Sequence, residues 1–263
     1  MEKDKKKDDY FKEKSSILSS ITGLITFSTI LPLNFHTRIE DMAKFTWFWP
    51  FISGGVGIIG LIISYFTIEI LKLSPLLSAI LIYSFYLLFN GFHHLDGLMD
   101  FGDAVMAHGS PERKIAIMRD PMIGTGAVAL LIIVGFISIG AIDSILTLKL
   151  FGAILIGEIS GKIGLITCAL SSKPGVDGTG KFFIENMSVF KYLIAILITA
   201  IISYLILSYA GVFGILGGML GGGIVAYISK KQFKIATGDV LGASNEIGRM
   251  ISFVLMIIAI NLI

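Results

Sequence analysis

Charged residues and cysteine are both scarce in this chain of 263 residues. Asp, Glu, Lys and Arg make up 15% of it, against roughly a quarter in an ordinary soluble domain, which disfavours a soluble protein. Cys168 is the single cysteine, so an intramolecular disulfide and a thiolate metal cluster are excluded. The formal net charge of +2 is too small to indicate nucleic-acid binding. The N-terminal run mixes acids with bases and therefore does not resemble a signal peptide.

Long apolar runs are what the sequence has in abundance. Hydrophobic residues make up 54% of the chain, the mean hydropathy is +0.85, and the 30 glycines suit close packing of membrane helices. A helix needs about twenty apolar residues to cross a bilayer. The sequence therefore predicts an all-α, polytopic membrane protein with about seven transmembrane helices, at 46–70, 75–93, 122–142, 145–170, 190–210, 212–229 and 247–263.

The charge distribution predicts how these helices are oriented. With the lysine-rich tail 1–15 inside, the basic loops 94–121, 171–189 and 230–246 all face the cytoplasm, as the positive-inside rule requires. The segment 17–33 must then begin and end on that side, as an interfacial or re-entrant piece. We therefore expect a multi-pass protein of the cell membrane, in which a charged cytoplasmic tail (1–15) precedes a single transmembrane catalytic domain (16–263).

Three aspartates form a ladder in the first polar loop, in the stretch "HHLDGLMDFGD" (93–103). Asp96, Asp100 and Asp103 are spaced by four and three residues, so on a helix they share one stripe, which His93 extends. Like charges at these spacings repel, and a divalent cation between them would relieve the repulsion. Carboxylate oxygens favour Mg²⁺, with Mn²⁺ as an alternative. We expect the three aspartates to be metal ligands.

Other interpretations of the ladder remain open. It could be a solvated acidic helix end, although carboxylates at a membrane boundary are usually functional in a chain so poor in charge. The histidines could indicate zinc, but no cysteine is near them. His94 could be a hydrogen-bonded helix-end residue, or it could act in proton transfer beside Asp96.

Basic and flexible residues follow the ladder in "PERKIAIMRDPMIGTG" (111–126). Arg113 and Arg119 carry the planar donors that suit phosphate oxygens, and Gly124 allows a close backbone approach. Asp120 could pair with an arginine or complete the metal cluster. Together these residues predict a site for a phosphorylated ligand held through a cation.

Two further groups of polar residues are candidates for substrate binding. Thr237 and Asp239 precede the last apolar run, where a helix N-terminus would attract anions unless Asp239 simply caps that helix; Asn245 continues the same polar stretch. Glu158 and Lys162 lie four residues apart within an apolar run. We expect them to pair with each other or to face a polar cavity, since burying either alone would be costly.

The motifs resemble those of a known family. "HLDGLMDFGDAV" (94–105) and "ERKIAIMRDPMIGTGAV" (112–128) are similar to the signature of the cobalamin synthases (adenosylcobinamide-GDP ribazoletransferases), and "TGDVLGASNE" (237–246) resembles their second signature. "TFSTILPL" (26–33) and "FTWFWPFISGGVGIIGLI" (45–62) are similar to the N-terminal region of that family. Many members carry an arginine where this chain has Ile30, and often one in the fifth span, where only Lys162 is nearby.

The resemblance implies a reaction and roles for these residues. The ribose hydroxyl of α-ribazole, or of its 5′-phosphate, attacks the phosphate on cobinamide in adenosylcobinamide-GDP, and GMP leaves. His94, Asp96 and Asp120 would be catalytic, with Asp120 a base or a supporting ligand. The substrate-binding residues would be Arg113, Arg119, Gly124, Lys162, Thr237, Asp239 and Asn245. Corrinoid and nucleotide small molecules and the bilayer are the expected partners; a homo-oligomer is left open.

Two alternatives compete with this function. A transporter could use the embedded carboxylates as an ion path, but transport sites tend to lie near the midplane of the membrane. The chemistry is also similar to that of CDP-alcohol phosphotransferases, whose ladder begins Asp-x-x-Asp-Gly. Here His93 stands where the first of those aspartates would be.

Overall fold

The computed structural model describes residues 16–33 and 37–262, so the predicted tail 1–15 lies outside the described residues. The described chain is helical, without a strand. Its helices are α2 (Ile17–Ser28), α3 (Ile39–Ala43), α4 (Trp49–Tyr65), α5 (Pro75–Phe89), α6 (His93–Met106), α7 (Pro111–Met118), α8 (Thr125–Thr147), α9 (Gly152–Ser171), α10 (Gly180–Glu185), α11 (Val189–Gln232) and α12 (Gly238–Asn261). A 3₁₀ turn, Thr46–Phe48, precedes α4, and a π-helical turn, Phe66–Ile70, follows it.

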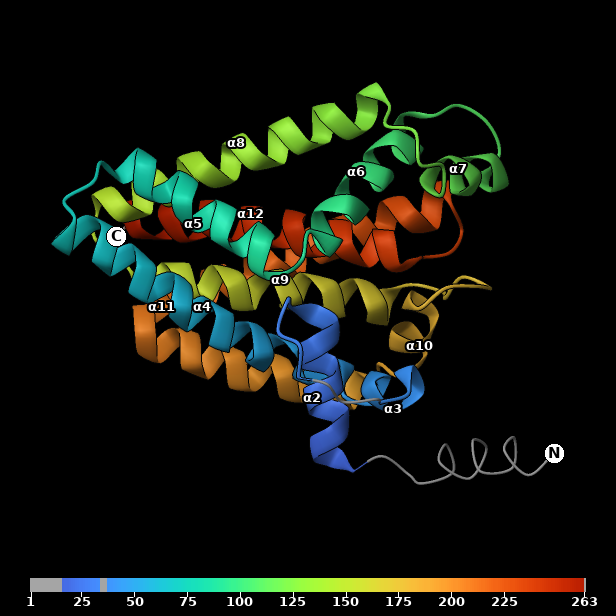
Figure 1. Ribbon diagram of the computed structural model, residues 1–263, viewed down its shortest axis with the longest axis horizontal. Coiled ribbons are helices and arrows are strands. Elements are labelled where there is room, and N and C mark those ends of the chain that lie inside the picture. The colour runs from blue at the N-terminus through green and yellow to red at the C-terminus, as the bar shows by residue number, and fades with distance from the viewer. Residues whose placement is uncertain (1–15, 34–36, 263) are drawn as a thin grey trace.

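Five helical segments of the described chain are long and apolar enough to cross a membrane: Thr46–Ile70, α8, α9, α11 and α12. The pair α5 and α6 is bent by 93° and could count as a sixth, broken span. In that pair α5 supplies the apolar part, whereas α6 carries three aspartates, whose charge favours a place outside the hydrocarbon core of the bilayer. The prediction of an all-α polytopic membrane protein is therefore confirmed (Figure 1).

Helix α11 accounts for two of the predicted spans. Leu207 and Ser208 have non-helical backbone angles that divide it into two arms. The first arm runs antiparallel to α9, because Tyr192 hydrogen-bonds Thr167 (3.0 Å) while Ile206 lies beside Gly152. The second arm runs parallel to α9, because Gly214 packs on Ile156 and Gly222 on Gly164. The predicted spans 190–210 and 212–229 therefore correspond to the arms of a helical hairpin.

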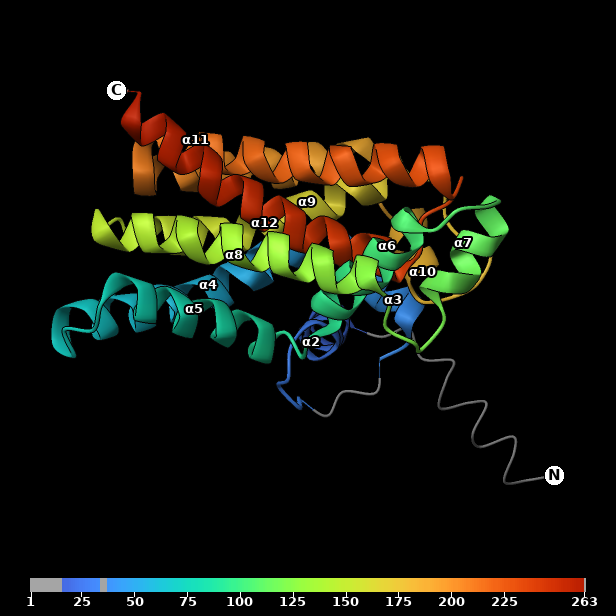
Figure 2. The same cartoon turned by 90° about the horizontal axis from the view of Figure 1, so that it is seen from above.

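Several predicted boundaries differ from the structure. α8 continues to Thr147 and α9 begins at Gly152, so the predicted break near residue 143 lies too early, because Asp143 and Ser144 are accommodated inside the helix. α12 begins at Gly238 rather than at 247, since Thr237 accepts a hydrogen bond from the Val240 amide and caps it there. Helix α2 has 12 residues and runs across the bundle direction (Figures 1 and 2).

Helix α9 is the centre of the bundle. In the most apolar stretch of α9, 89% of the residues are buried inside the protein, whereas in that of α11 only 22% are. Helix α11 therefore lies at the periphery of the bundle. α4, α11 and α12 pack around α9. α7, α10 and the chain connections near them lie at one end of the bundle (Figure 1), where the amide of Ala236 donates to the Lys173 carbonyl (2.8 Å). The three predicted polar loops therefore share one end, which we call the polar end.

The close approach of α9 and α11 depends on Gly222. A Cβ added there would lie 2.1 Å from the Gly164 carbonyl oxygen, whereas a Cβ on Gly223 would meet nothing within 4 Å. Gly222→Ala should therefore force the helices apart and lower the free energy of unfolding by about 1–3 kcal/mol. Gly223→Ala, its matched control, should be neutral or slightly stabilising, because alanine favours helix. Thermal unfolding in detergent measures both, and equal stability of the two variants would contradict this account of the packing.

Candidate active site

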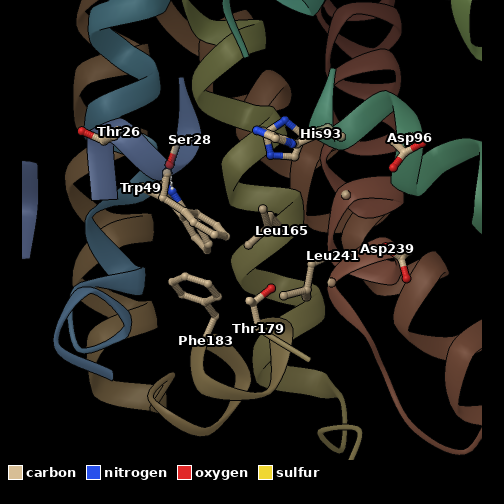
Figure 3. Close-up of a pocket in the computed structure, with 15 residues that line it drawn as sticks. Thr26, Ser28, Trp49, His93, Asp96, Leu165, Thr179, Phe183, Asp239 and Leu241 are labelled. Atoms are coloured by element: carbon tan, nitrogen blue, oxygen red, sulfur yellow. Dashed lines mark hydrogen bonds between the residues drawn. The ribbon is translucent and has the colours of Figure 1, made fainter. Parts of the chain in front are cut away.

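A cavity of about 490 Å³ opens at the polar end (Figure 3). Its walls come from α2, α4, α6, α9, α10 and α12, so residues far apart in the sequence meet there. Polar side chains on one side face aromatic side chains on the other. The lining residues are Thr26, Phe27, Ser28, Trp49, His93, His94, Asp96, Leu165, Thr179, Gly180, Phe183, Gly238, Asp239, Leu241 and Gly242.

The sharp bend before α6 brings the ladder to this cavity. Gly91 and Phe92 both have left-handed backbone angles, with φ of +63° and +60°. Glycine adopts such angles freely, but phenylalanine does so at a cost in strain. The bend directs α6 across the end of α5, and His93, His94 and Asp96 in its first turn reach the cavity wall. The predicted helical ladder is confirmed by the bounds of α6.

Asp103, the last aspartate of the ladder, holds α6 against the start of α8. One of its oxygens, Oδ2, accepts from the Gly124 amide (2.7 Å) and the other, Oδ1, from the Ala127 amide (2.8 Å). These amides belong to the first turn of α8, where N–H groups lack partners within the helix and favour a negative charge. Asp103 therefore fastens α6 to α8. Asp103 was predicted to be a metal ligand and Gly124 to contact the substrate. In the structure the two residues are hydrogen-bonded to each other.

Asp239 takes a place facing Asp96. Gly97 packs directly on the Asp239 backbone, where an added Cβ would lie 2.7 Å from the carbonyl oxygen, so α6 and α12 touch at this point. Asp96 and Asp239 consequently line the same cavity from two facing helices (Figure 3). Thr237 donates to the Asp239 carboxylate (3.1 Å) and itself caps α12. The cap is thus Thr237 rather than Asp239, because its hydroxyl reaches the Val240 amide.

The carboxylates around Asp100 repel one another. Burial, followed by the negative charges of Asp96, Asp239 and Asp103, raises the pKa of Asp100 to about 7. The described residues contain no group of three or more His, Cys, Asp or Glu side chains placed to hold a metal ion. The donor chemistry nevertheless fits Mg²⁺, because Mg²⁺ is usually bound by one or two carboxylates together with phosphate oxygens of a substrate.

The arginines and Asp120 do not line the cavity. Arg113, Arg119 and Asp120 are exposed on and after α7, and an Asp120 oxygen accepts from the Met122 amide (3.0 Å). Of the two arginines, Arg119 is the one whose positive charge acts on the Asp239 carboxylate. The structure therefore places these predicted residues outside the cavity.

Lys162 meets His94 behind the cavity wall. The Lys162 ammonium lies 2.8 Å from Nε2 of His94 and 5.9 Å from the centre of the Trp49 ring. Because an ammonium can only donate, Nε2 must accept and the proton of the neutral imidazole is assigned to Nδ1. Nδ1 has no hydrogen-bond partner in the described chain. It is therefore a buried donor without a partner, on a residue of the cavity wall.

Arg249 forms the centre of a buried ionic network. Its guanidinium donates to Glu158 (2.8 Å) and to Glu246. Asn90 donates to Glu158 (3.0 Å) and Asn245 to Glu246 (3.0 Å). Of the two arrangements expected for Glu158 and Lys162, the structure has neither: Glu158 pairs with Arg249, and neither residue lines the cavity. Asn245 lies inside this network and not at the cavity.

Aromatic side chains form the opposite wall, which sequence reasoning missed. The rings of Trp49 and Phe183 lie 4.5 Å apart, and Phe27 lies 5.1 Å from Phe183. The indole N–H of Trp49 donates to the Ser28 hydroxyl. The aromatic-rich stretch 45–51 was a visible signal, but nothing local to it indicated that Phe183, on α10, would join it.

These features define a multi-pass helical membrane protein with a carboxylate- and aromatic-lined cavity at one end of the bundle. The model of the cobalamin-5-phosphate synthase family matches residues 20–257, and the chain therefore belongs to that family.

Relatives in several organisms match nearly the full chain, and each is named adenosylcobinamide-GDP ribazoletransferase. Proteins from Methanococcoides burtonii and Methanosarcina barkeri are 28% and 30% identical, each over 94% of both chains. A third, from Acetivibrio thermocellus, is 32% identical over 90% of this chain and 97% of its own. No solved structure matches the chain.

Arg249 offers a test of the buried network. Arg249→Leu leaves Glu158 and Glu246 buried without a cation, and should lower the free energy of unfolding by about 3–5 kcal/mol. The exposed Arg113 provides a matched control, since Arg113→Leu should change it by less than about 0.5 kcal/mol. Chemical unfolding in detergent micelles measures both. A loss for Arg249→Leu no larger than that for the control would show that the network does not stabilise the bundle.

Proposed function

We propose that this protein joins α-ribazole, or its 5′-phosphate, to adenosylcobinamide-GDP, giving adenosylcobalamin, or its 5′-phosphate, and GMP. The observation that carries the proposal is the match to ribazoletransferases along almost the whole chain. The cavity supports it, since Asp96, Asp239 and the aromatic wall all lie within the matched residues 20–257.

The reaction exchanges the phosphoanhydride bond of adenosylcobinamide-GDP for a phosphodiester bond. A ribose hydroxyl oxygen attacks the phosphorus attached to cobinamide, a new P–O bond forms, and the bond to the GMP phosphate breaks. The hydroxyl proton must pass to a base, for which Asp96 and Asp239 at the cavity wall are the nearest carboxylates. GMP departs with the bonding electron pair as a phosphate monoester.

Asp96 and Asp239, the two carboxylates that line the cavity, are the residues that we propose hold Mg²⁺, with the charge of Asp100 beside them. Their clustered negative charge supports this assignment, whereas the Asp103 oxygens are engaged with α8. Bound there, the cation would neutralise the diphosphate and align it for in-line displacement. With two carboxylates from the chain, oxygens of the substrate phosphates would supply further ligands.

His94 is proposed as a donor to the phosphate rather than as a base. With Nε2 accepting from Lys162, the hydrogen is on Nδ1, which is buried and unpartnered, so the ring must turn before it can donate to an oxygen of the substrate. Lys162 thereby acts through His94, as a positioning residue. Arg113 and Arg119, outside the cavity, would bind phosphate groups that extend outward. The tilted rings of Trp49 and Phe183 offer an aromatic surface for the planar base of the ribazole.

We also propose that the polar end faces the cytoplasm. The basic residues of 94–121, 171–189 and 230–246 gather there, and the positive-inside rule then sets the orientation. An ion path through the bundle is disfavoured, because the buried Glu158 and Glu246 are both bound by Arg249. The nucleotide and the hydrophilic part of the corrinoid would approach from the aqueous side.

Asp96 and Asp239 should be essential for the reaction. Purified protein in detergent, supplied with adenosylcobinamide-GDP, α-ribazole and Mg²⁺, should release GMP, and Asp96→Asn or Asp239→Asn should slow release at least about 100-fold. Asp143→Asn, on α8 and away from the cavity, is the matched control and should keep wild-type activity. Wild-type protein that releases no GMP with both substrates would refute the proposed function.

The metal requirement is tested separately. Chelation with EDTA should abolish GMP release, and added Mg²⁺ or Mn²⁺ should restore it, since both prefer carboxylate and phosphate oxygens. Full activity after exhaustive chelation would overturn the metal assignment while leaving the transferase reaction intact. Calcium serves as a control, because its larger and more flexible coordination sphere should support the in-line geometry poorly.

A further inference from the structure

A second cavity lies at the polar end where α9 and α11 both terminate. It has a volume of about 360 Å³ and shares no lining residue with the first cavity. Leu170 and Ile235 form its apolar part. Its polar lining consists of Lys173, Lys230, Lys234, Ser171, Ser172 and Ser229.

The lysines of this second cavity lack a negative partner. Its lining contains no carboxylate, and within the described part of the chain no ion pair involves Lys173, Lys230 or Lys234. At the opposite end of the bundle, by contrast, Lys72 and Lys149 both pair with Glu69. Three ammonium groups around one cavity repel one another, and a bound anion would relieve that repulsion.

The surface next to the cavity is suited to lipid. Leu220, Ile224 and Tyr227 follow one another on α11 at spacings of four and three residues, so they share one face. All three side chains are exposed, Tyr227 by 65%. The stripe leads along the helix to Lys230, and an exposed tyrosine followed by lysine is typical of the membrane–water interface.

We propose that the second cavity binds the headgroup phosphate of an anionic phospholipid, whose acyl chains lie along the stripe Leu220–Ile224–Tyr227. The lysines contact the phosphate, and the serine hydroxyls of Ser171 and Ser172 are available to its oxygens. This assignment is independent of the proposed transferase reaction, because it rests only on charge, cavity and position at the end of the apolar helices.

A lipid in this place would support the active site mechanically. Lys173 and Gly175 hold Ala236 through two backbone hydrogen bonds, of 2.8 Å and 3.0 Å. Ala236 is followed after three residues by Asp239 at the cavity wall. The bound headgroup would therefore stabilise the two hydrogen-bonded segments, at 173–175 and at Ala236, and with them the start of α12.

The experiment compares lipids that differ only in headgroup. Full-length protein in detergent is titrated with phosphatidylglycerol or with phosphatidylcholine of the same acyl chains, and bound lipid is counted by native mass spectrometry. We expect the wild type to prefer phosphatidylglycerol. The double variant Lys173→Gln/Lys230→Gln should lose affinity for phosphatidylglycerol by roughly fivefold for each lysine.

The control variant removes the same charge nearby. Lys181→Gln/Lys231→Gln alters two lysines of the polar end that do not line the cavity, and it should bind phosphatidylglycerol like the wild type. The single variants Lys230→Gln and Lys231→Gln, at adjacent positions, repeat the comparison with minimal effect on folding. Unchanged binding in the cavity variants, or an equal loss in both double variants, would overturn the proposal.

Inorganic phosphate distinguishes the source of the anion. If it displaces phosphatidylglycerol from the wild type as effectively as an equal concentration of competing phosphatidylglycerol, the cavity is a site for free phosphate and the lipid assignment is wrong. Displacement only by lipid supports it. Equal wild-type binding of phosphatidylglycerol and phosphatidylcholine would likewise refute it, since a headgroup site must discriminate by charge.

Discussion

A charge inside an apolar helix bundle needs its partners inside the bundle as well, and the contacts of Arg249 show how strongly this constraint acts. Its guanidinium joins Glu158 on α9 to Glu246 on α12. The rings of Tyr83 and Tyr86 on α5 lie 5.5 Å and 5.3 Å from it. Since no water in a bilayer could replace these contacts, α5, α9 and α12 are fixed in one register.

The cavity follows from that register. With α9 held against α12, Lys162 lies one turn beyond Glu158 and reaches His94 (2.8 Å) at the start of α6. The contact of Gly97 with the Asp239 backbone then sets Asp96 opposite Asp239. The ionic network and the candidate active site are thus neighbouring layers, the first buried and internally paired, the second open and lined by Asp96 and Asp239.

The sequence was informative wherever local spacing determines the outcome. The helical periodicity of Asp96, Asp100 and Asp103 predicted α6, and the apolar runs predicted the spans. The sequence could not predict pairings between distant residues. Glu158 and Arg249 are 91 positions apart, whereas spacing alone favoured Lys162, four residues away, as the partner of Glu158. The same holds for the aromatic wall, because Trp49 and Phe183 meet only once α4 and α10 are packed.

The roles within the ladder also depend on tertiary structure. Asp103 has the same spacing as its neighbours, yet its oxygens are used by α8, and the carboxylate that joins Asp96 at the cavity comes from another helix, as Asp239. Local sequence could give the position of the side chains on α6. Local sequence could not show that Asp103 would be hydrogen-bonded by the amides of a distant segment.

The fastening of α6 to α8 by Asp103 has a consequence for how the motif's charge is counted. Three aspartates suggest three negative charges presented to a ligand, but one of them is already balanced by the amide dipoles of a helix N-terminus. The negative charge that the motif presents to a ligand is therefore smaller than its three aspartates suggest. The electrostatic field that a diphosphate meets is shaped by two helices, and its strength depends on the contact between α6 and α12 as much as on the ladder itself.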